Sequence, residues 1–497
     1  MGEIKEDANA EERGVDNKKL DDVLAEFFYG CNIPFAVADS IYFKNLIKAL
    51  RPSYDPPHRR LLSGKLLDEA HEKIIKRNTN LVKQMDEEAT LLVDGWQNSA
   101  SNRHNVVTML STATDQKIFL ESFDFSNIRE TGSNLLEAVN ESIKIAKDRY
   151  NATVTSILSD NAANMVNMGK SAQDSLNVVF STCNAHSANL LAGDILKDSK
   201  RAATMSKVMM IQKEYKKTGL EDRLLKIGGH KPVLSCATRW TSQRDAVESM
   251  LKNQTAMKKV AADCDLEILN DERAIRPKRQ VSQLLYDVEF QEEARNLLHI
   301  LDPVAELTNF CQKSSSSAAD AIEKWLVLFS DCPDLRDLFE NRCKKSNVFN
   351  IVTMTANYFH PVYRGQKLTQ EQLQEVKNFI FEQLDADALE SCRMYIKNEG
   401  PFGALQRKQI SSTKAFWHYA AELGHQNLSK FALKLLKIPA STAQLERLFS
   451  NWGYIHNNIR NRLSVETSKK LVDVYFTLRS ADNITYEYED FNSSDQN

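Results

Sequence analysis

Residues 89–96 read ATLLVDGW, and the runs NVVTMLSTA (105–113) and KIFLESFDF (117–125) follow after short polar stretches. Each run is short and rich in β-branched and aromatic residues, which is typical of strands. Strands that are joined by short turns pair antiparallel. The sequence therefore predicts three successive strands that form the antiparallel part of one sheet.

Two more strands are expected after a helix. Residues 131–150, TGSNLLEAVNESIKIAKDRY, have the apolar spacing of an amphipathic helix, and the strand-like runs VTSILSD (154–160) and LNVVFSTC (176–183) come later, with helical sequence between and after them. Strands joined through helices pair in parallel. This order of elements is the RNase H-like order, so we expect an α/β domain with a mixed five-stranded sheet and helices on its faces.

The rest of the sequence is predicted to form helices, apart from a disordered tail at each end. A large all-helical insertion domain interrupts the RNase H-like core, because strand signals nearly vanish over more than two hundred residues. The predicted segments are a disordered tail (1–19), an N-terminal helical region (20–88), the first part of the core (89–196), the helical insertion (197–430), the last part of the core (431–480) and an acidic disordered tail (481–497).

Composition excludes several classes of protein. The N-terminus is charged, and no apolar run reaches the roughly 18 residues that a membrane span needs, so we expect a soluble intracellular protein with no membrane partner. The eight cysteines include no CxxC pair. This spacing favours neither a disulfide framework nor a zinc finger formed by neighbouring residues.

Charge gives a local signal where the whole chain gives none. The formal net charge is −3, but between Lys197 and Lys231 ten basic residues stand against four acidic ones, a local net charge of +6. Such a patch is able to meet phosphate groups, and a solvated helix face is the alternative interpretation.

Three carboxylates are candidates for a metal site. Asp94 follows the apolar residues 91–93 of a predicted central strand, where a charge needs a metal ion, an arginine or an exposed strand end to compensate it. Asp160 ends the fourth strand and is a metal ligand or the N-cap of the next helix. Because the first and fourth strands lie side by side in this topology, both carboxylates can converge on one ion.

Glu446 is the third candidate. The sequence restarts a helix after Pro439, with Ser441 and Gln444 spaced as a capping box, which places Glu446 in the second turn. Taken alone, this glutamate is interpreted as a solvated charge or as a weak ion pair with Arg447.

Four blocks carry a resemblance to a known family. SDNAANM (159–165), CNAHSANLL (183–191), TRW (238–240) and IPASTAQLERLFSNWGYIHNNIRNRL (438–463) occur in the order of the signature blocks of hAT-superfamily DNA transposases, and the similarity covers about residues 20–480. The resemblance implies that Asp94, Asp160 and Glu446 are a catalytic triad that binds two Mg²⁺ or Mn²⁺ ions. Such ions promote in-line phosphoryl transfer on DNA.

The resemblance also implies roles for residues outside the triad. His186, in a C-x2-H arrangement with Cys183, would lie beside the active site and approach the scissile phosphate; a helix-face histidine and a buried thiol are the alternatives. Trp240, next to Arg239, would stack on a base flipped out of the flanking DNA, although a core tryptophan is the alternative. Further candidates for DNA contacts are Lys213, Lys216 and Lys217.

The last block resembles the C-terminal dimerisation region of the family, so self-association is expected. The apolar face of the final helix, which includes Leu471, Val472, Tyr475 and Leu478, would pack on another subunit or within its own chain.

The sequence departs from the family at its start. The family begins with a zinc-coordinating BED finger, but the first cysteine here is Cys31 and the first histidine is His58, which leaves no room for a finger. Either the sequence begins after the finger or end recognition has been lost. The first hypothesis is a metal-dependent DNA transposase, and its rivals are a domesticated, non-catalytic DNA-binding or dimerising scaffold and a stand-alone nuclease. Nuclear localisation is expected from the DNA substrate, with RPKR (276–279) as a weak basic signal.

Overall fold

A five-stranded sheet forms the centre of the α/β part of the chain. In the computed structural model, which describes residues 17–84, 88–98, 103–112, 117–176, 178–236, 241–268, 275–408, 410, 412–455 and 463–481, the strands lie in the order β3-β2-β1-β4-β5. They are β1 (Glu88–Asn98), β2 (Arg103–Ser111), β3 (Lys117–Asp124), β4 (Thr153–Ser159) and β5 (Val179–Thr182). The mixed sheet confirms the predicted fold class.

The antiparallel half of the sheet forms as its sequence pattern predicts. β1 pairs antiparallel with β2, and β2 pairs antiparallel with β3. β1 is the middle strand of the sheet, and its residues Leu91, Leu92 and Val93 are fully buried. A central strand is covered on both faces, which is why an uninterrupted apolar run rather than an alternating one forms it.

The described chain divides into two compact units. The first comprises residues 1–157, 174–178 and 444–497, and the second comprises residues 158–173 and 179–443. The helices of the first unit are α1 (Asn17–Gly30), η1 (Phe35–Asp39), α2 (Ile41–Leu50), α3 (Arg59–Ser63), α4 (Lys65–Lys83), α5 (Gly132–Tyr150), α21 (Ala443–Ile455) and α22 (Val465–Ala481).

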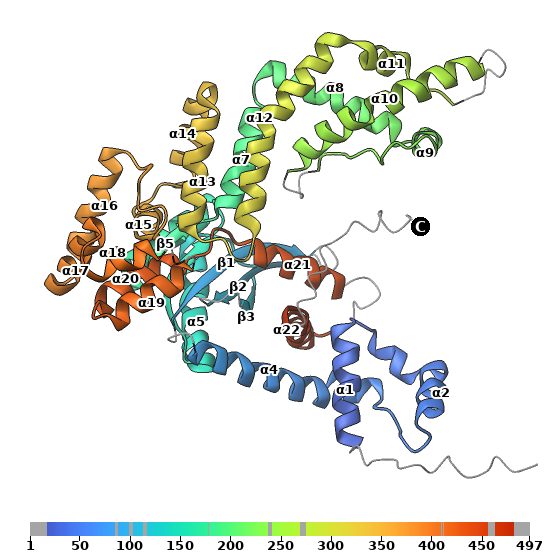
Figure 1. The fold of residues 1–497 in the computed structure, drawn as a ribbon. Coiled ribbons are helices and arrows are strands. Elements are labelled where there is room, and N and C mark those ends of the chain that lie inside the picture. Colours follow the sequence, from blue (N-terminus) through green and yellow to red (C-terminus); the bar gives the residue numbers. More distant parts are fainter. Residues whose placement is uncertain are drawn as a thin grey trace, which may run out of the picture. The chain divides into compact units, whose positions relative to one another are not determined.

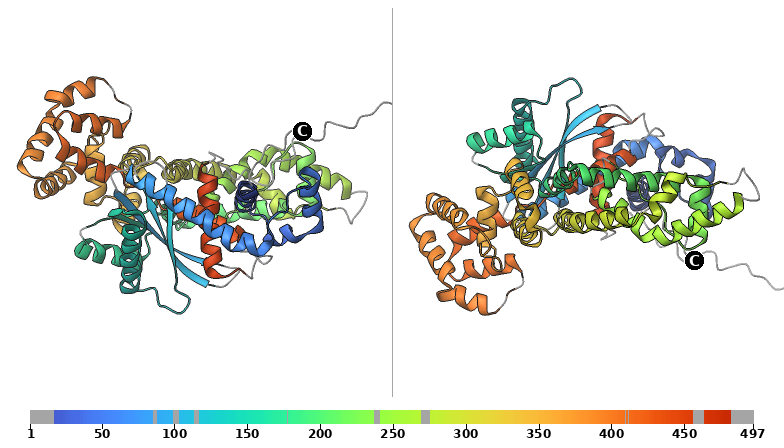
Figure 2. Two further views of the ribbon diagram at one scale, coloured as in Figure 1. Left: turned by 90° about the horizontal axis from the view of Figure 1, so that it is seen from below. Right: turned by 90° about the horizontal axis from the view of Figure 1, so that it is seen from above.

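In the first unit the last helices return to the N-terminal ones. α22 packs against α1 and α4, and Lys470 of α22 forms an ion pair with Asp68 of α4 at 2.6 Å. Figures 1 and 2 show α21 and α22 in red near the blue N-terminal helices, although most of the chain lies between them in sequence. α5 lies against β2 and β3, where Ser142 Oγ donates to Thr108 Oγ1 at 3.1 Å.

The second unit is built almost entirely of helices. They are α6 (Ala163–Leu176), α7 (Asn184–Ile195), α8 (Ser199–Tyr215), α9 (Thr218–Lys226), α10 (Ser242–Ile268), α11 (Arg279–Tyr286), α12 (Val288–Gln312), α13 (Ala318–Asp331), η2 (Pro333–Leu335), α14 (Arg336–Lys345), α15 (Ile351–Phe359), α16 (Gln370–Gln383), α17 (Ala386–Lys397), α18 (Gly400–Arg407), α19 (Thr413–Glu422) and α20 (Gln426–Leu436). α7 packs on α12 and α14, and Arg342 of α14 binds the carboxylate of Asp194 at the end of α7.

One detail of the sequence prediction is wrong. α21 begins at Ala443, so Glu446 lies in its first turn rather than its second. The hydroxyl of Ser441 donates to Cys311 O at 2.7 Å and accepts from the Ala443 N–H at 3.4 Å. A carboxylate in the first turn is favoured by the partial positive charge of the helix N-terminus.

Within the described part of the chain, no helix combines the length and the apolar character needed to cross a membrane.

Candidate functional site

Asp94 is a buried carboxylate in the middle strand of the sheet. It lies within β1, opposite Val107 of β2, and is 9% exposed. The strand continues beyond it to Asn98, so Asp94 is held by ladder hydrogen bonds on both sides in sequence. Its position in a rigid central strand suits a residue whose side chain must be held in one place.

Trp96 links this strand to the helix of Glu446. Side chains two residues apart in a strand point to the same face, so Trp96 and Asp94 share one face of β1. The Trp96 ring stacks on Phe449 with 5.5 Å between ring centroids and an interplanar angle of 6°. Trp452, one turn further along α21, also meets Trp96, at 5.4 Å. These contacts fix α21 against the face of the sheet that carries Asp94.

The direction of α21 follows from the same aromatic cluster. Trp452 lies edge-on to Phe119 of β3 at 5.8 Å, whereas Phe449 stacks on Trp96 of β1. The helix thus advances from β1 towards β3 as residue numbers rise. Glu446 lies in the first turn of this helix, one turn before Phe449.

Glu446 has an unusual protonation equilibrium. Burial raises the pKa of its carboxyl to about 7, and the neighbouring Arg447 opposes part of this rise. A metal ion would favour the charged form and lower this pKa again. Perturbed carboxyl groups of this kind are concentrated at functional sites.

Asp160 follows directly after β4 and lies in the second unit. One carboxylate oxygen, Oδ1, accepts a hydrogen bond from the Ala162 N–H at 3.1 Å, just before α6. The cap-like role that the sequence left open is therefore present for one of the two oxygens. Asn161 fixes the turn, because its amide donates to Cys183 O and to Ser187 Oγ, both at 3.0 Å.

His186 lies in the same unit, on the first turn of α7. Burial lowers the pKa of its imidazole, the carboxylate of Asp160 raises it, and the guanidinium of Arg342 lowers it. The ring is therefore mostly neutral at pH 7. The charge of Asp160 is close enough to act on it, so the second unit brings Asp160 and His186 into one neighbourhood.

Cys183 joins three segments of the chain, which contain Ser159, His186 and Thr442. Its backbone N–H donates to Ser159 O at 2.8 Å, next to Asp160. Its buried thiol sulfur accepts from the His186 N–H and from the Thr442 N–H, each at 3.4 Å. The segment before Asp160, the start of α7 and the segment that leads into the helix of Glu446 thus meet at one fully buried residue.

The neighbouring residue strengthens this junction. The Asn184 N–H donates to Ala440 O at 3.0 Å, and its side-chain oxygen accepts from Trp325 Nε1 of α13 at 3.2 Å. Asn184 is itself buried. These contacts between α7, α13 and residue 440 were not foreseen, because nothing in the local pattern of CNAHSANLL indicates partners so distant in sequence.

A polar network holds the other side of the same segment. Ala318 N–H donates to Ile438 O at 2.8 Å, and Ala440 N–H donates to Ser316 O at 2.9 Å. The adjoining turn is fixed by Asp320, whose carboxylate accepts from Ser317 Oγ at 2.7 Å and from Tyr363 OH at 2.8 Å.

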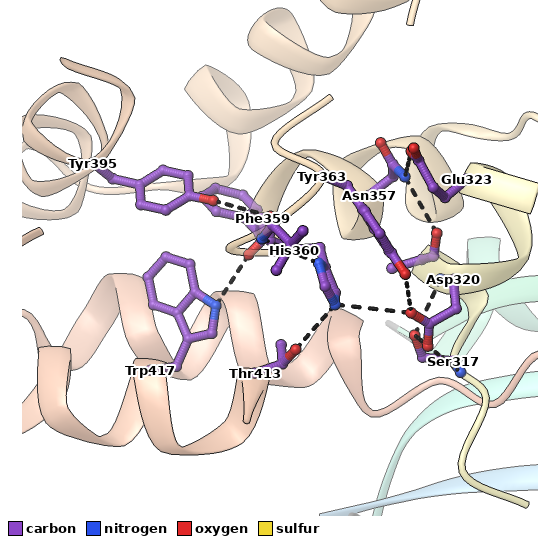
Figure 3. A network of polar contacts seen from close by, with 12 residues as sticks. Ser317, Asp320, Glu323, Asn357, Phe359, His360, Tyr363, Tyr395, Thr413 and Trp417 are labelled. Atoms are coloured by element: carbon purple, nitrogen blue, oxygen red, sulfur yellow. Dashed lines mark hydrogen bonds and ion pairs between the residues drawn. The ribbon is translucent and has the colours of Figure 1, made fainter. Parts of the chain in front are cut away.

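Figure 3 shows this network, with Asp320 between Ser317 and Tyr363 and with the His360 ring next to Thr413. The His360 ring stacks on Tyr363 at 3.9 Å, and its Nε2 lies 3.0 Å from Thr413 Oγ1. Helices α13, α15 and α19 thereby share one set of polar contacts. We interpret it as the structural support of residues 438–440.

The residues predicted to contact DNA differ in their exposure and in their ion pairs. Lys213, Lys216 and Lys217 are exposed at the end of α8, and Lys217 forms an ion pair with Glu214 at 2.7 Å. Other basic side chains of this region are also ion-paired: Lys197 with Asp194, and Lys200 and Lys207 with Glu293. Arg239 and Trp240 lie outside the described residues.

Among the described residues, no group of three or more histidine, cysteine, aspartate or glutamate side chains is arranged to hold a metal ion. Asp94 and Glu446 belong to the first unit, and Asp160 and His186 belong to the second. The convergence of all three carboxylates stays a prediction.

Two family models match the chain. Residues 57–215 match a domain of unknown function (DUF659), and residues 405–477 match the hAT family C-terminal dimerisation region. The first match contains Asp94, Asp160 and His186, and the second contains Glu446. No curated protein was found to match the chain.

Proposed function

The chain is a hAT-family transposase-like protein, and from this premise we propose that it cleaves and joins DNA strands through divalent metal ions bound by Asp94, Asp160 and Glu446. The two family matches support a transposase or a protein derived from one. The reaction and the residues that perform it are our proposal.

One observation carries the proposal. Ser159 and Thr442 both form hydrogen bonds with Cys183, and these two residues lead directly to Asp160 and into the helix of Glu446. Asp94 shares a strand face with Trp96, on which the helix of Glu446 packs. Within the second unit, Cys183 thus brings together the segments that lead to Asp160 and to α21. Within the first unit, Trp96 holds α21 against the strand of Asp94.

The donor set fits Mg²⁺ or Mn²⁺. Carboxylates are hard oxygen ligands, which these ions prefer. Bound ions would activate a water or a 3′-hydroxyl and stabilise the leaving oxygen of an in-line phosphoryl transfer. Glu446 carries a carboxyl whose pKa of about 7 allows it to lose its proton when a cation binds.

The protein residues around the triad have separate tasks. His186, whose imidazole is mostly neutral at pH 7, is able to donate a hydrogen bond to a phosphate oxygen or to accept a proton. Lys213 and Lys216 present exposed ammonium groups for the DNA backbone. Arg239 and Trp240 are proposed to hold flanking DNA, with Trp240 stacked on an unpaired base. The DNA substrate places the proposed activity in the nucleus.

A second candidate function has an observation of its own. The match to the hAT C-terminal dimerisation region fits a domesticated, non-catalytic DNA-binding or dimerising scaffold as well. The two functions differ in whether the protein changes the DNA.

The experiment adds Mn²⁺ and a hairpin-forming DNA flank to the purified full chain and separates the strands on a denaturing gel. We expect cleavage by the parent protein and a loss of at least ~100-fold with Asp94→Asn, which keeps the shape of the side chain but removes the charge. Asp148→Asn, at an exposed position of α5, is the matched control and should leave cleavage unchanged. DNA binding without any cleavage, equal with and without Mn²⁺, would establish the scaffold instead.

A further inference from the structure

The N-terminal helices carry an unusual amount of exposed apolar surface. Of the 20 large apolar side chains that are exposed in the described part of the chain, seven fall between residues 23 and 50: Val23, Phe27, Val37, Ile41, Tyr42, Leu46 and Leu50. Single exposed apolar residues are common, but a dense group marks a contact surface.

On α2 these residues form a stripe. Tyr42, Leu46 and Leu50 are spaced four residues apart, so they lie along one side of the helix. Their exposed fractions are 84%, 55% and 74%. The opposite side of α2 packs inward, where Phe43 meets Phe28 of α1 edge-on at 5.4 Å. No residue of α2 is buried, so this helix has apolar residues on both sides and a partner on only one.

α1 adds a second, shorter stripe. Val23 and Phe27 are one turn apart on α1 and are 58% and 51% exposed. The inner side of α1 is packed, because Ala25, Phe28 and Tyr29 are at most 2% exposed. Both helices therefore keep an apolar outer face after completing their contacts within the unit.

The C-terminal region points to the occupant of this face. The match to the hAT dimerisation region, residues 405–477, suggests that copies of the chain associate. However, the apolar face of α22 is already used, because Leu471, Val472 and Tyr475 are at most 7% exposed and α22 packs against α1 and α4 of its own unit. These side chains have no free area for a second copy.

Exposed apolar area for a second copy lies instead on α1, which packs against α22, and on the neighbouring α2. The end of α1 contacts the matched region. Asn32, two residues beyond the helix, donates from Nδ2 to Tyr454 O at 3.3 Å. Tyr454 belongs to the matched region and is 54% exposed. The exposed N-terminal stripes are therefore continuous with the part of the chain that the family uses for association.

We propose that the outer face of α1 and α2 is the contact surface for a second copy of this chain, with Tyr42, Leu46 and Leu50 at its centre. A two-fold contact presents the same patch from each subunit, and an apolar helix stripe is able to pair with its own copy. The inference rests on the self-association that the C-terminal match suggests, and it is independent of catalysis.

The test measures the molar mass of the full chain by sedimentation equilibrium at several concentrations. We expect the parent to form dimers, and we expect Leu46→Glu/Leu50→Glu to weaken the dimer by at least ~100-fold in Kd, because it would bury carboxylates in the contact. The matched control is Tyr419→Glu/Leu423→Glu at the C-terminal end of α19; the two side chains are 50% and 54% exposed and also lie in the matched region. It should remain dimeric.

Folding is checked separately, by circular dichroism and thermal melting. If the double variant loses its helical signal, the single variant Tyr42→Glu replaces it, since Tyr42 is the most exposed of the three side chains. A folded α2 variant that remains as dimeric as the parent overturns the inference, as does a control variant that alone becomes monomeric. A parent that is monomeric at every concentration overturns both the inference and the suggested self-association, whereas the DNA cleavage assay would stand unaffected.

Discussion

At Glu446, burial and function make opposing demands on one carboxyl group. Burial raises its pKa to about 7, so ionisation costs free energy in the metal-free protein. A carboxyl whose folded pKa lies above its unfolded value contributes stability below the unfolded pKa, near 4.5, and loses it as the pH rises through 7. A bound cation would reverse this cost.

We therefore expect Glu446→Gln to stabilise the metal-free protein at pH 8, by up to about 3 kcal/mol, and to leave its stability unchanged at pH 4. Urea unfolding at both pH values measures the difference. Glu137→Gln, at an exposed position of α5, serves as the control and should show no such pH dependence. Equal effects of Glu446→Gln at pH 4 and pH 8 would show that the carboxyl is not held in a buried environment.

Residue identities in the candidate site were predictable to different degrees. Asp94 lies on the first strand, as predicted, and Asp160 follows directly after the fourth strand, which the sequence expected it to end, because short runs of β-branched residues define strands locally. The pKa of Glu446 was not predictable, since it depends on burial by parts of the chain that are distant in sequence. The aromatic contacts of Trp96 with Phe449 and Trp452 were hidden for the same reason.

At the scale of elements, Cys183 connects β4, α7 and the segment before α21. Its sulfur accepts from the buried N–H of Thr442 and from the N–H of His186. Removing the sulfur would leave the Thr442 N–H without this acceptor, and an unsatisfied buried donor costs about 1–3 kcal/mol.

Cys183→Ala should accordingly destabilise the protein more than Cys392→Ala does, by about 1–3 kcal/mol. Cys392 is a suitable control because it is also buried, at 3% exposed. Chemical denaturation of both variants gives the comparison, and Cys183→Ser should recover part of the loss because a hydroxyl oxygen also accepts. Equal losses for the two alanine variants would mean that Cys183 acts only by filling space.

Element type was easier to predict than element contact. Strands and helices follow from periodicity, and the five strands and the helical character of residues 20–88 were expected. The start of α21 differs from the predicted start by one residue, because the Ser441 hydroxyl donates to Cys311 O, a partner distant in sequence. The sequence left two partners open for the face of α22, and the structure buries Leu471, Val472 and Tyr475 within their own unit.

For the whole molecule, the sum of charges matters less than their pairing. The net charge is −3, yet Lys213 and Lys216 are exposed at the end of α8. Lys200 and Lys207, on the same helix, share the single carboxylate of Glu293 at 3.3 and 3.9 Å. Only cations that are free to approach phosphate contribute to DNA binding through the release of counterions.

Lys213→Ala/Lys216→Ala should therefore reduce the slope of log K against log[salt] by about 2 units for a DNA duplex, because each phosphate contact contributes about 0.9. Fluorescence anisotropy between 50 and 200 mM salt measures this slope. Lys200→Ala/Lys207→Ala, which removes two ion-paired cations, should change it by less than half as much. The reverse order would place the DNA on the other side of α8.

The contact between Trp96 and Phe449 can form only after the ribosome has synthesised α21, long after β1. About 350 residues separate the two rings, so at about 5–20 residues per second the ribosome delivers α21 roughly 20–70 s after β1. During that interval the nascent sheet lacks its covering helix and leaves the indole of Trp96 without its aromatic partners. A chain that terminates before residue 443 would keep this face bare, and its expected fate is capture by chaperones or aggregation.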